Sequence, residues 1–202
     1  MNDLSVNRLR SLAAAWWAEA RGNPWLWRGL LIAAAIILLD QLSKHWIVYQ
    51  VGLPHLGKIE ISQIFDLSYV ENRGASFGLL DGKRWLLAVI TSSVGIALVV
   101  WLGTLTRRVA AIGVGFIIGG AFGNLYDRLV YGFVVDFLDF SGVPFPNFER
   151  IASFPFVNIY IGGFIWVFNV ADMAINVGVA LLLLDAWQTR EQTNGSNLSK
   201  KS

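Results

Sequence analysis

The stretch GGAFGNLYDRLVYGFVVDF, residues 119–137, decides how the rest of the chain is interpreted. It begins as an apolar, glycine-containing segment with membrane-helix character and ends outside that helix. Along it, four polar or charged side chains come to lie at or near a bilayer surface: Asn124, Asp127, Arg128 and Asp136. Such groups are costly in apolar surroundings and are usually kept for function. We interpret the stretch as half of an intramembrane active site, with a second apolar segment, FNVADMAIN (168–176), as the other half.

The composition is typical of a membrane protein. Hydrophobic residues make up 55% of the 202 residues and the mean hydropathy is +0.54, which is rare for a soluble domain of this size. The net charge of +2 does not suggest a nucleic-acid partner, so the basic residues are better interpreted as topology signals. The absence of cysteine excludes disulfides, thiolate metal sites and a cysteine nucleophile, and two histidines are too few for a histidine-rich metal site. We expect neither a metal nor a cofactor.

Four apolar segments predict a membrane protein of the all-α class, with spans at about 25–49, 85–103, 109–130 and 163–185. Tryptophan and tyrosine at the ends of these segments are typical of the two membrane interfaces. In the third span, glycines recur every four residues and predict close helix packing: Gly115, Gly119 and Gly123.

The two ends of the chain differ from this four-span domain, which covers 25–188. Residues 1–24 combine leucine, alanine and tryptophan with arginine, which predicts a basic amphipathic helix on the membrane surface, although a solvated arm is an alternative. The segment does not resemble a cleavable signal peptide, because the following apolar run continues to a full span. Residues 189–202 are polar and predict a disordered tail.

Two loops connect the spans on the other side. Residues 50–84 contain partly alternating runs of β-branched and aromatic residues, which predict a small sheet on the membrane surface. Residues 131–163 are rich in phenylalanine and proline, which argues against regular helix in the first half of that loop.

The distribution of basic residues predicts the orientation. The N-terminal arm, the turn at Arg107 and Arg108, and the tail carry most of them and share one side of a four-span topology, so both termini should be cytoplasmic. Four basic residues in the outer loops make this bias incomplete: Lys58, Lys83, Arg84 and Arg150. In this orientation eight polar side chains from separate segments converge toward the outer side: Asp40, Lys44, Asn72, Asn124, Asp127, Asp136, Asn169 and Asp172.

Asp40 and Lys44 are four residues apart, so they share a helix face. They could neutralise each other at the outer interface, or contact a substrate or the active site. We favour the second interpretation, because two charges at this depth need a reason beyond solubility.

The spacing groups the remaining polar residues into two sets. Asn124, Asp127 and Arg128 should form one patch on the third span, and Asn169, Asp172 and Asn176 one stripe on the fourth. Asp172 has no adjacent basic residue, so its carboxyl would tend to be protonated unless a partner holds it ionised.

Asp136 is the natural partner of Asp172. Two close carboxyls share one proton, so the ionised one can activate water while the protonated one polarises a carbonyl. This is aspartic-peptidase chemistry, which needs no cysteine, histidine or metal. A helix cap at Asp136 and a proton-relay role for either carboxyl remain alternatives.

Two other classes of protein compete with a peptidase. A proton-coupled transporter or lipid-binding protein would need a polar path to both faces, but the inner halves of the spans are apolar. A purely structural protein could use the polar groups to hold helices together, but this does not explain why they gather on one side.

The chain also resembles the bacterial lipoprotein signal peptidases (signal peptidase II), a family of four-span aspartic endopeptidases with a small outer sheet and a surface helix. The matching segments occur in family order: DQLSK (40–44), ENRGASFG (71–78), GGAFGNLYDR (119–128) with GFVVDF (132–137), and FNVADMAI (168–175).

The resemblance implies an activity, a location and roles for individual residues. Asp136 and Asp172 match the catalytic aspartates, and eight positions match motif residues that bind substrate or support the site: Asp40, Lys44, Asn72, Arg73, Asn124, Asp127, Arg128 and Asn169. Family members lie in the bacterial cytoplasmic (inner) membrane among its lipids, with the site near the outer face. They cut prolipoproteins before a diacylglyceryl-modified cysteine and are inhibited by globomycin-type peptides.

The chain departs from the family pattern in two places. Residues 141–163 look like an insertion between the two aspartates, which we expect to add a lid or a membrane-dipping segment. The N-terminal arm is also longer than expected.

Overall fold

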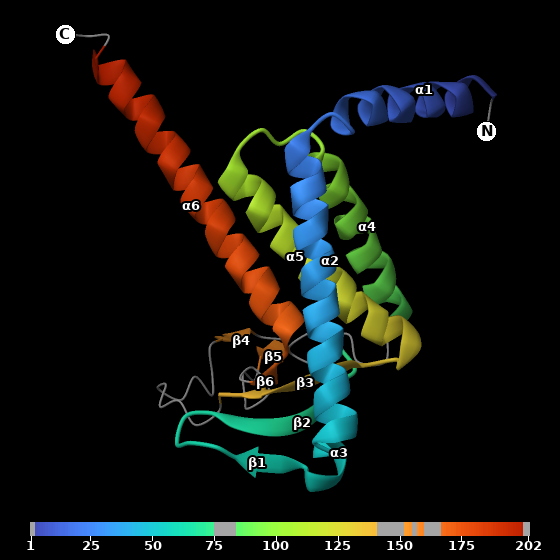
Figure 1. The fold of residues 1–202 in the computed structure, drawn as a ribbon, viewed down its shortest axis with the longest axis vertical. Coiled ribbons are helices and arrows are strands. Elements are labelled where there is room, and N and C mark those ends of the chain that lie inside the picture. Colours follow the sequence, from blue (N-terminus) through green and yellow to red (C-terminus); the bar gives the residue numbers. More distant parts are fainter. Residues whose placement is uncertain (1–2, 75–83, 141–151, 155–156, 160–166, 200–202) are drawn as a thin grey trace.

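The computed structural model describes the backbone of residues 3–74, 84–140, 152–154, 157–159 and 167–199. Figure 1 shows a helical bundle with a small sheet at one end and both chain termini at the other. The elements lie along the chain as α1 (Asp3–Ala20), α2 (Pro24–His45), the π-helical turn η1 (Trp46–Gln50), α3 (Leu53–Leu56), β1 (Lys58–Glu60), β2 (Asp66–Asn72), α4 (Arg84–Leu102), α5 (Arg108–Val130), β3 (Val134–Asp139), β4 (Ala152–Phe154), β5 (Val157–Ile159), β6 (Val167–Phe168) and α6 (Val170–Ser199).

The prediction of four membrane-spanning helices is confirmed. Four segments are long and apolar enough to cross a membrane: Pro24–Gln50, Arg84–Leu102, Arg108–Val130 and Val170–Glu191. In α5, 61% of an 18-residue apolar stretch is buried inside the protein, against 22–28% of the corresponding stretches in the other three spans. The third span is therefore the centre of the bundle, and the others leave most of their apolar surface for lipid.

Both predicted limits of the fourth span are wrong. The helix starts at Val170 instead of 163, because Val167 and Phe168 pair as a strand with Asp139 and Leu138. Asn169 then caps the helix, its Oδ1 accepting from the backbone N–H of Asp172 at 3.0 Å. At the other end α6 continues through Ser199, so the prediction of a disordered tail is wrong for residues 189–199. No proline interrupts this segment, and its Gln, Arg and Glu residues favour helix.

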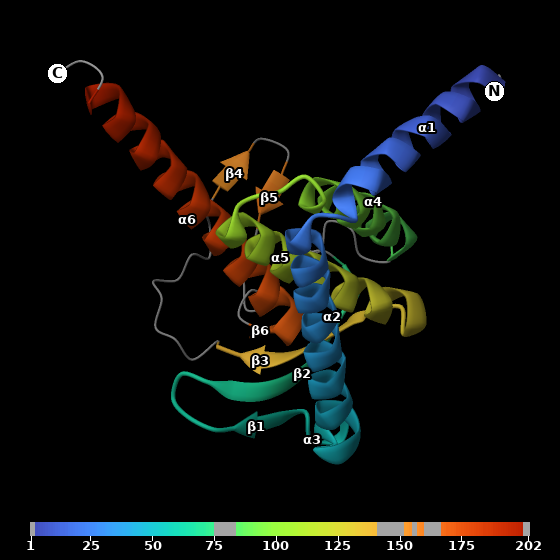
Figure 2. The ribbon, with the colours of Figure 1, turned by 45° about the horizontal axis from the view of Figure 1, so that its top comes forward.

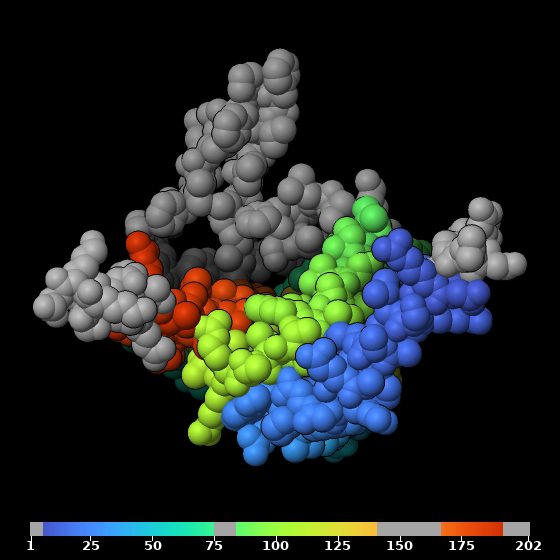
Figure 3. Space-filling view, turned by 90° about the horizontal axis from the view of Figure 1, so that it is seen from above, coloured from blue at the N-terminus to red at the C-terminus, as the bar shows by residue number. Residues whose placement is uncertain are grey.

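Close packing of α5 depends on its glycines, as predicted, but they face two neighbours. A Cβ on Gly115 would lie 2.7 Å from the backbone oxygen of Gly29 on α2. A Cβ on Gly120 would lie 2.3 Å from the backbone oxygen of Ala171 on α6. Figure 3, which looks onto the terminal end of the bundle, shows α5 between α2 and α6. The glycines thus bring both neighbouring helices into backbone contact with α5.

The predicted sheet exists, but two of its four strands lie outside 50–84: β3 comes from the second loop, and β6 from the segment predicted to begin the fourth span. Its antiparallel order is β1-β2-β3-β6, and β2 pairs with β3 so that Val70 lies opposite Asp136. Asp136 is therefore in a strand, and the alternative of a helix cap at this position is wrong. Strands β4 and β5 form a separate two-stranded sheet within the predicted insertion; the rest of 141–163 lies outside the described residues.

One face of the sheet is fixed by an apolar cluster. Val135 and Phe137 of β3 pack with Ile47 of η1 and Leu53 of α3. Because side chains alternate along a strand, Asp136, which lies between these two residues, points to the opposite face of the sheet, toward Asn169 at the start of α6.

The N-terminal segment is helical, as predicted for an amphipathic arm. Figures 1 and 2 show α1 projecting from the end of the bundle opposite the sheet. Trp16 attaches it to α4 by donating from Nε1 to the backbone oxygen of Val100 at 3.2 Å.

Candidate active site

A buried charge cluster joins α2 to α5 at the sheet end of the bundle. Lys44 Nζ lies 2.8 Å from Asp40 Oδ2 and 2.8 Å from Asp127 Oδ2. Both carboxyls are 0% exposed and Lys44 is 4% exposed. A buried lysine between two carboxyls costs much desolvation energy unless every group is paired. Here the groups are paired, so the cluster defines one relative position of α2 and α5.

The same cluster holds the backbone on which the two aspartates stand. Asp127 Oδ2 accepts from the backbone N–H of Val135 at 3.2 Å, next to Asp136. Asp40 Oδ1 accepts from the backbone N–H of Ala171 at 3.0 Å, next to Asp172. Asp40 and Asp127 therefore position both halves of the candidate site. The favoured interpretation of Asp40 and Lys44, contact with the site, agrees with this geometry, and the two residues also form the ion pair.

Gln41 is a residue of the cluster that the sequence analysis missed. Its Nε2 donates to Asp40 Oδ2 at 3.0 Å and to Asp127 Oδ1 at 2.9 Å. Its position within the DQLSK segment was the available signal. An uncharged side chain beside two charged ones did not stand out as a candidate.

Asp136 and Asp172 lie around a shared residue, Asn169. The Nδ2 of Asn169 donates to Asp136 Oδ1 at 2.6 Å, and its backbone N–H donates to Asp172 Oδ2 at 3.3 Å. The other carboxylate oxygens accept from Asn72 Nδ2, at 3.0 Å to Asp136, and from Asn124 Nδ2, at 2.8 Å to Asp172. Three asparagines, on β2, on α5 and at the N-cap of α6, thus orient one carboxyl on β3 and one on α6.

The environment changes the acidity of Asp136. Burial is the largest cause that raises its pKa, and the negative charge of Asp172 raises it further. Hydrogen bonds from Asn72 and Asn169 and the charge of Lys44 oppose this, and the resulting pKa is about 7. Asp136 can therefore carry a proton near neutral pH while a neighbouring carboxylate acts as a base.

The predicted patch of Asn124, Asp127 and Arg128 is divided between different partners. Asn124 bridges Lys44 and Asp172, whereas Asp127 belongs to the charge cluster. Arg128 donates to the backbone oxygen of Asn124 at 3.3 Å, and its charge interacts with those of Asp172 and Asp136. Arg128 thus supplies positive charge near the two carboxyls without a direct ion pair among the described residues.

Arg73 lies away from the two carboxyls. Its guanidinium pairs with Glu71 and lies 5.4 Å from the ring centroid of Phe133. Its side chain is 62% exposed. Asn176, predicted to extend the stripe of Asn169 and Asp172, is exposed on α6. Neither residue is part of the polar centre formed by the described residues.

Comparison with known proteins identifies a family for this chain. Residues 32–188 match the family model described as signal peptidase (SPase) II. The chain is 45% identical over 175 residues to a lipoprotein signal peptidase of Caulobacter vibrioides, covering 82% of this chain and 89% of that protein. It is 40% identical to the lipoprotein signal peptidase of Brevibacillus brevis, covering 78% of this chain and 93% of that protein.

The fold also has a solved counterpart. A bacterial membrane enzyme superposes with a TM-score of 0.63 at 26% identity, covering 82% of this chain and 90% of the solved one. The motif order, the four spans and this match over most of the chain agree with one another, and the chain belongs to the signal peptidase II family of membrane aspartic endopeptidases.

Proposed function

We propose that this protein removes signal peptides from diacylglyceryl-modified prolipoproteins, cutting before the lipidated cysteine, with Asp136 and Asp172 as the catalytic dyad. The observation that carries the proposal is the double contact of Asn169, which binds one carboxyl through its side chain and the other through its backbone. Cleavage before a lipidated cysteine rests on the family, whose members here are named lipoprotein signal peptidases.

The chemistry requires the two carboxyls to hold one proton between them. We assign the proton to Asp136, whose pKa is raised to about 7 by burial and by the negative charge of Asp172, so Asp172 is the ionised member. It takes a proton from a water molecule, and the water oxygen attacks the scissile carbonyl carbon. Asp136 donates its proton to the carbonyl oxygen, which becomes the hydroxyl of a tetrahedral intermediate. When the C–N bond breaks, that hydroxyl proton returns to Asp136 and Asp172 gives its proton to the leaving amine.

The supporting residues have separate tasks in this mechanism. Asn72, Asn124 and Asn169 orient the carboxyls, and Asp40, Lys44 and Asp127 hold the backbone beside them. Arg128 adds positive charge that offsets the negative charge of the dyad. We propose that Arg73, which is exposed near the sheet, contacts a bound substrate chain.

The proposed location is the bacterial cytoplasmic membrane, with both termini in the cytoplasm and the site near the outer face. The termini lie at the end opposite the sheet and the dyad (Figure 1). This arrangement would place the dyad where an exported, lipid-anchored precursor emerges.

The test is cleavage of a diacylglyceryl-modified prolipoprotein by purified variants in detergent or liposomes. Asp136→Asn and Asp172→Asn should each lower kcat by at least about 10³-fold, since each removes one acid or base from the reaction. Glu60→Gln, which neutralises an exposed carboxyl on β1, should retain full activity. A globomycin-type peptide should inhibit the wild type. Full cleavage by either aspartate variant, with folding verified by its thermal transition, would refute the dyad.

A further inference from the structure

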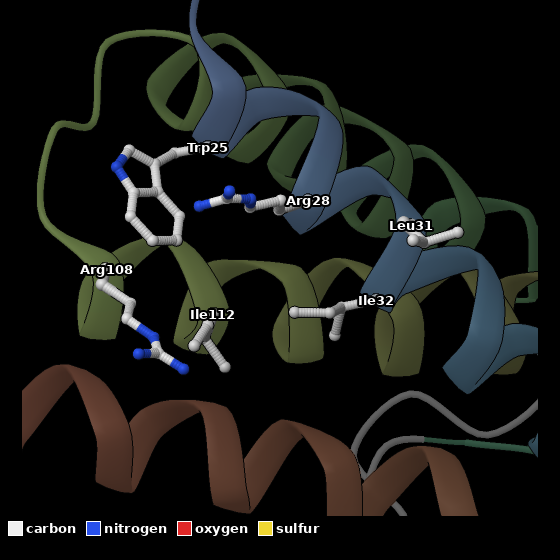
Figure 4. A pocket seen from close by; sticks show the side chains of 6 residues that line it. All are labelled: Trp25, Arg28, Leu31, Ile32, Arg108 and Ile112. Atoms are coloured by element: carbon white, nitrogen blue, oxygen red, sulfur yellow. The ribbon is translucent and has the colours of Figure 1, made fainter.

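A second candidate site lies at the end of the bundle opposite the dyad. A pocket of about 470 Å³ opens between the first turns of α2 and α5 (Figure 4). We call it the arginine groove, and its lining residues are Trp25, Arg28, Leu31, Ile32, Arg108 and Ile112.

The groove carries two positive charges that form no ion pair with a carboxylate in the described part of the chain. The guanidinium of Arg28 lies 4.6 Å from the ring centroid of Trp25, toward which it points in Figure 4. Arg28 and Arg108 are exposed, and neither has an acidic side chain within 4.0 Å among the described residues. Arg107, next in sequence to Arg108, is instead paired with Asp185 at 2.8 Å. The two groove arginines therefore remain available for an external anion.

The polarity of the groove changes with depth in the bundle. Arg108 begins α5 and Arg28 lies in the first turns of α2, which starts at Pro24. Ile112 and Ile32 lie four residues further along each helix, which is about 6 Å deeper at 1.5 Å per residue. One end of the groove is thus cationic and lies at the level of the helix starts, and the other end is aliphatic and extends into the membrane-spanning part.

The start of α5 adds to the positive potential. The N-cap position is Arg107, which makes no side-chain capping hydrogen bond. The first backbone N–H groups of an uncapped helix are unsatisfied and carry the positive end of the helix dipole. In α2, by contrast, Asn23 caps the helix by accepting from the Trp25 N–H at 2.9 Å.

We propose that the arginine groove binds an anionic glycerophospholipid. The phosphate group contacts Arg28 and Arg108, and one acyl chain lies along Leu31, Ile32 and Ile112. A free phosphate ion would use only the cationic end, and a zwitterionic lipid would place a second positive charge beside two arginines. The combination of two guanidinium groups with an aliphatic wall therefore favours a lipid with net negative charge.

Occupation of the groove would affect the whole bundle. The lipid would bridge α2 and α5, which meet in backbone contact at Gly29 and Gly115 and carry Asp40 and Asp127 at their other ends. A ligand that binds only the folded protein stabilises it by mass action. The bound lipid should therefore raise the unfolding temperature, whether or not the proposed peptidase function is correct.

The test measures lipid binding by the purified full-length protein in non-ionic detergent. Phosphatidylglycerol and phosphatidylcholine with the same acyl chains are added separately, and bound lipid is counted by native mass spectrometry alongside thermal unfolding. We expect retained phosphatidylglycerol and a raised unfolding temperature with that lipid only. Arg28→Gln with Arg108→Gln should weaken binding by about fivefold for each arginine, from the energy of a basic residue near an anionic membrane surface.

The matched control is Arg8→Gln with Arg10→Gln. These residues are exposed on α1 at the same end of the bundle, outside the groove lining. The control removes the same charge and should leave phosphatidylglycerol binding unchanged. An equal loss in both double variants would overturn the proposal in favour of general attraction to basic residues, and so would equal binding of phosphatidylcholine.

A further variant distinguishes a lipid from a bare phosphate. Leu31 is exposed on the groove wall, so Leu31→Gln should fold and should still weaken phosphatidylglycerol binding. Inorganic phosphate at millimolar concentration should not displace the lipid. Unchanged binding in Leu31→Gln, or full displacement by inorganic phosphate, would refute an acyl-chain site.

Discussion

The carboxyl of Asp136 is partly protonated at neutral pH because burial and the charge of Asp172 raise its pKa to about 7. In the proposed mechanism this proton is transferred to the substrate. Cleavage should therefore fall as the pH rises through about 7, where Asp136 loses the proton. A profile of kcat/KM between pH 5 and pH 9 measures this alkaline limb.

Asn72 provides a test of whether that limb belongs to Asp136. Its hydrogen bond stabilises the ionised carboxyl and so lowers the pKa of Asp136. Asn72→Ala should move the alkaline limb upward, by about half to one pH unit for one hydrogen bond to a charged group. Asn176→Ala, at an exposed position on α6, should leave the profile unchanged. A downward shift in Asn72→Ala would contradict the assignment.

The raised pKa of Asp136 also has a consequence for stability. Its pKa is about 7 in the folded protein against an ordinary value of 3.8, so between these pH values the folded state binds a proton that the unfolded state lacks. The free energy of unfolding therefore decreases as the pH rises from about 4 to 7, and the loss persists above pH 7.

Asp136→Asn removes the ionisable group and should avoid this loss. At pH 8 we expect the variant to have a larger free energy of unfolding than the wild type, by an amount on the order of a few kcal/mol, and hence a higher unfolding temperature. At pH 4 the two should differ little. Differential scanning fluorimetry in detergent at the two pH values measures the difference. A variant that is less stable than the wild type at pH 8 would show that burial does not destabilise the ionised carboxyl of Asp136.

At the scale of residues, the sequence predicted the groups whose burial is expensive. Asp40, Lys44, Asp127, Asp136 and Asp172 stood out because charge in apolar segments needs a reason. The hydrogen-bond partners of these groups were harder to predict from the sequence, because hydrogen bonds depend on side-chain directions that residue spacing does not define. Gln41 was therefore missed, and the placement of Arg73 outside the polar centre was not foreseen.

At the scale of elements, hydropathy predicted the four spans but not the strand that carries Asp136. Only a short turn separates α5 from β3, and Gly132 in this turn has a φ of +86°, which favours glycine. The strand is completed by pairing with β2, more than 60 residues earlier in the chain, as in the Val70–Asp136 pair. Such a distant pairing leaves no local periodic signal, and this also explains why the strand before α6 was predicted as helix.

The contact between α5 and α6 offers a test at the same scale. A Cβ on Gly120 would lie 2.3 Å from the backbone oxygen of Ala171, which cannot move without displacing the first turn of α6 and hence Asp172. Gly120→Ala should lower stability by about 1–3 kcal/mol and kcat by about 10²-fold, as expected when a catalytic group moves by about 1 Å.

Thermal unfolding and the prolipoprotein assay measure both effects of Gly120→Ala. Gly22→Ala serves as the control, because a Cβ there meets only the Glu19 backbone oxygen at 3.5 Å. If Gly120→Ala cleaved at the wild-type rate, the close approach of the two helices would not position the dyad.

At the scale of the whole molecule, the two ends of the bundle have different chemistry. The sheet end carries the dyad and the charge cluster that supports it. The other end carries α1 and both termini (Figures 1 and 2), and also the arginine groove (Figure 4). The sequence predicted this polarity from the positions of basic and acidic residues. It could not predict the groove, which forms only where the starts of α2 and α5 meet.

The orientation of these two ends in the membrane can be measured by labelling single cysteines from one side. The chain contains no cysteine, so single cysteines can be introduced without a background. Ser11 is exposed on α1, and Gln63 is exposed between β1 and β2. With both termini cytoplasmic, Gln63→Cys should react with a membrane-impermeant maleimide in spheroplasts, and Ser11→Cys only after the membrane is permeabilised. The opposite pattern would place the dyad on the cytoplasmic side, where a precursor that has already been exported could not reach it.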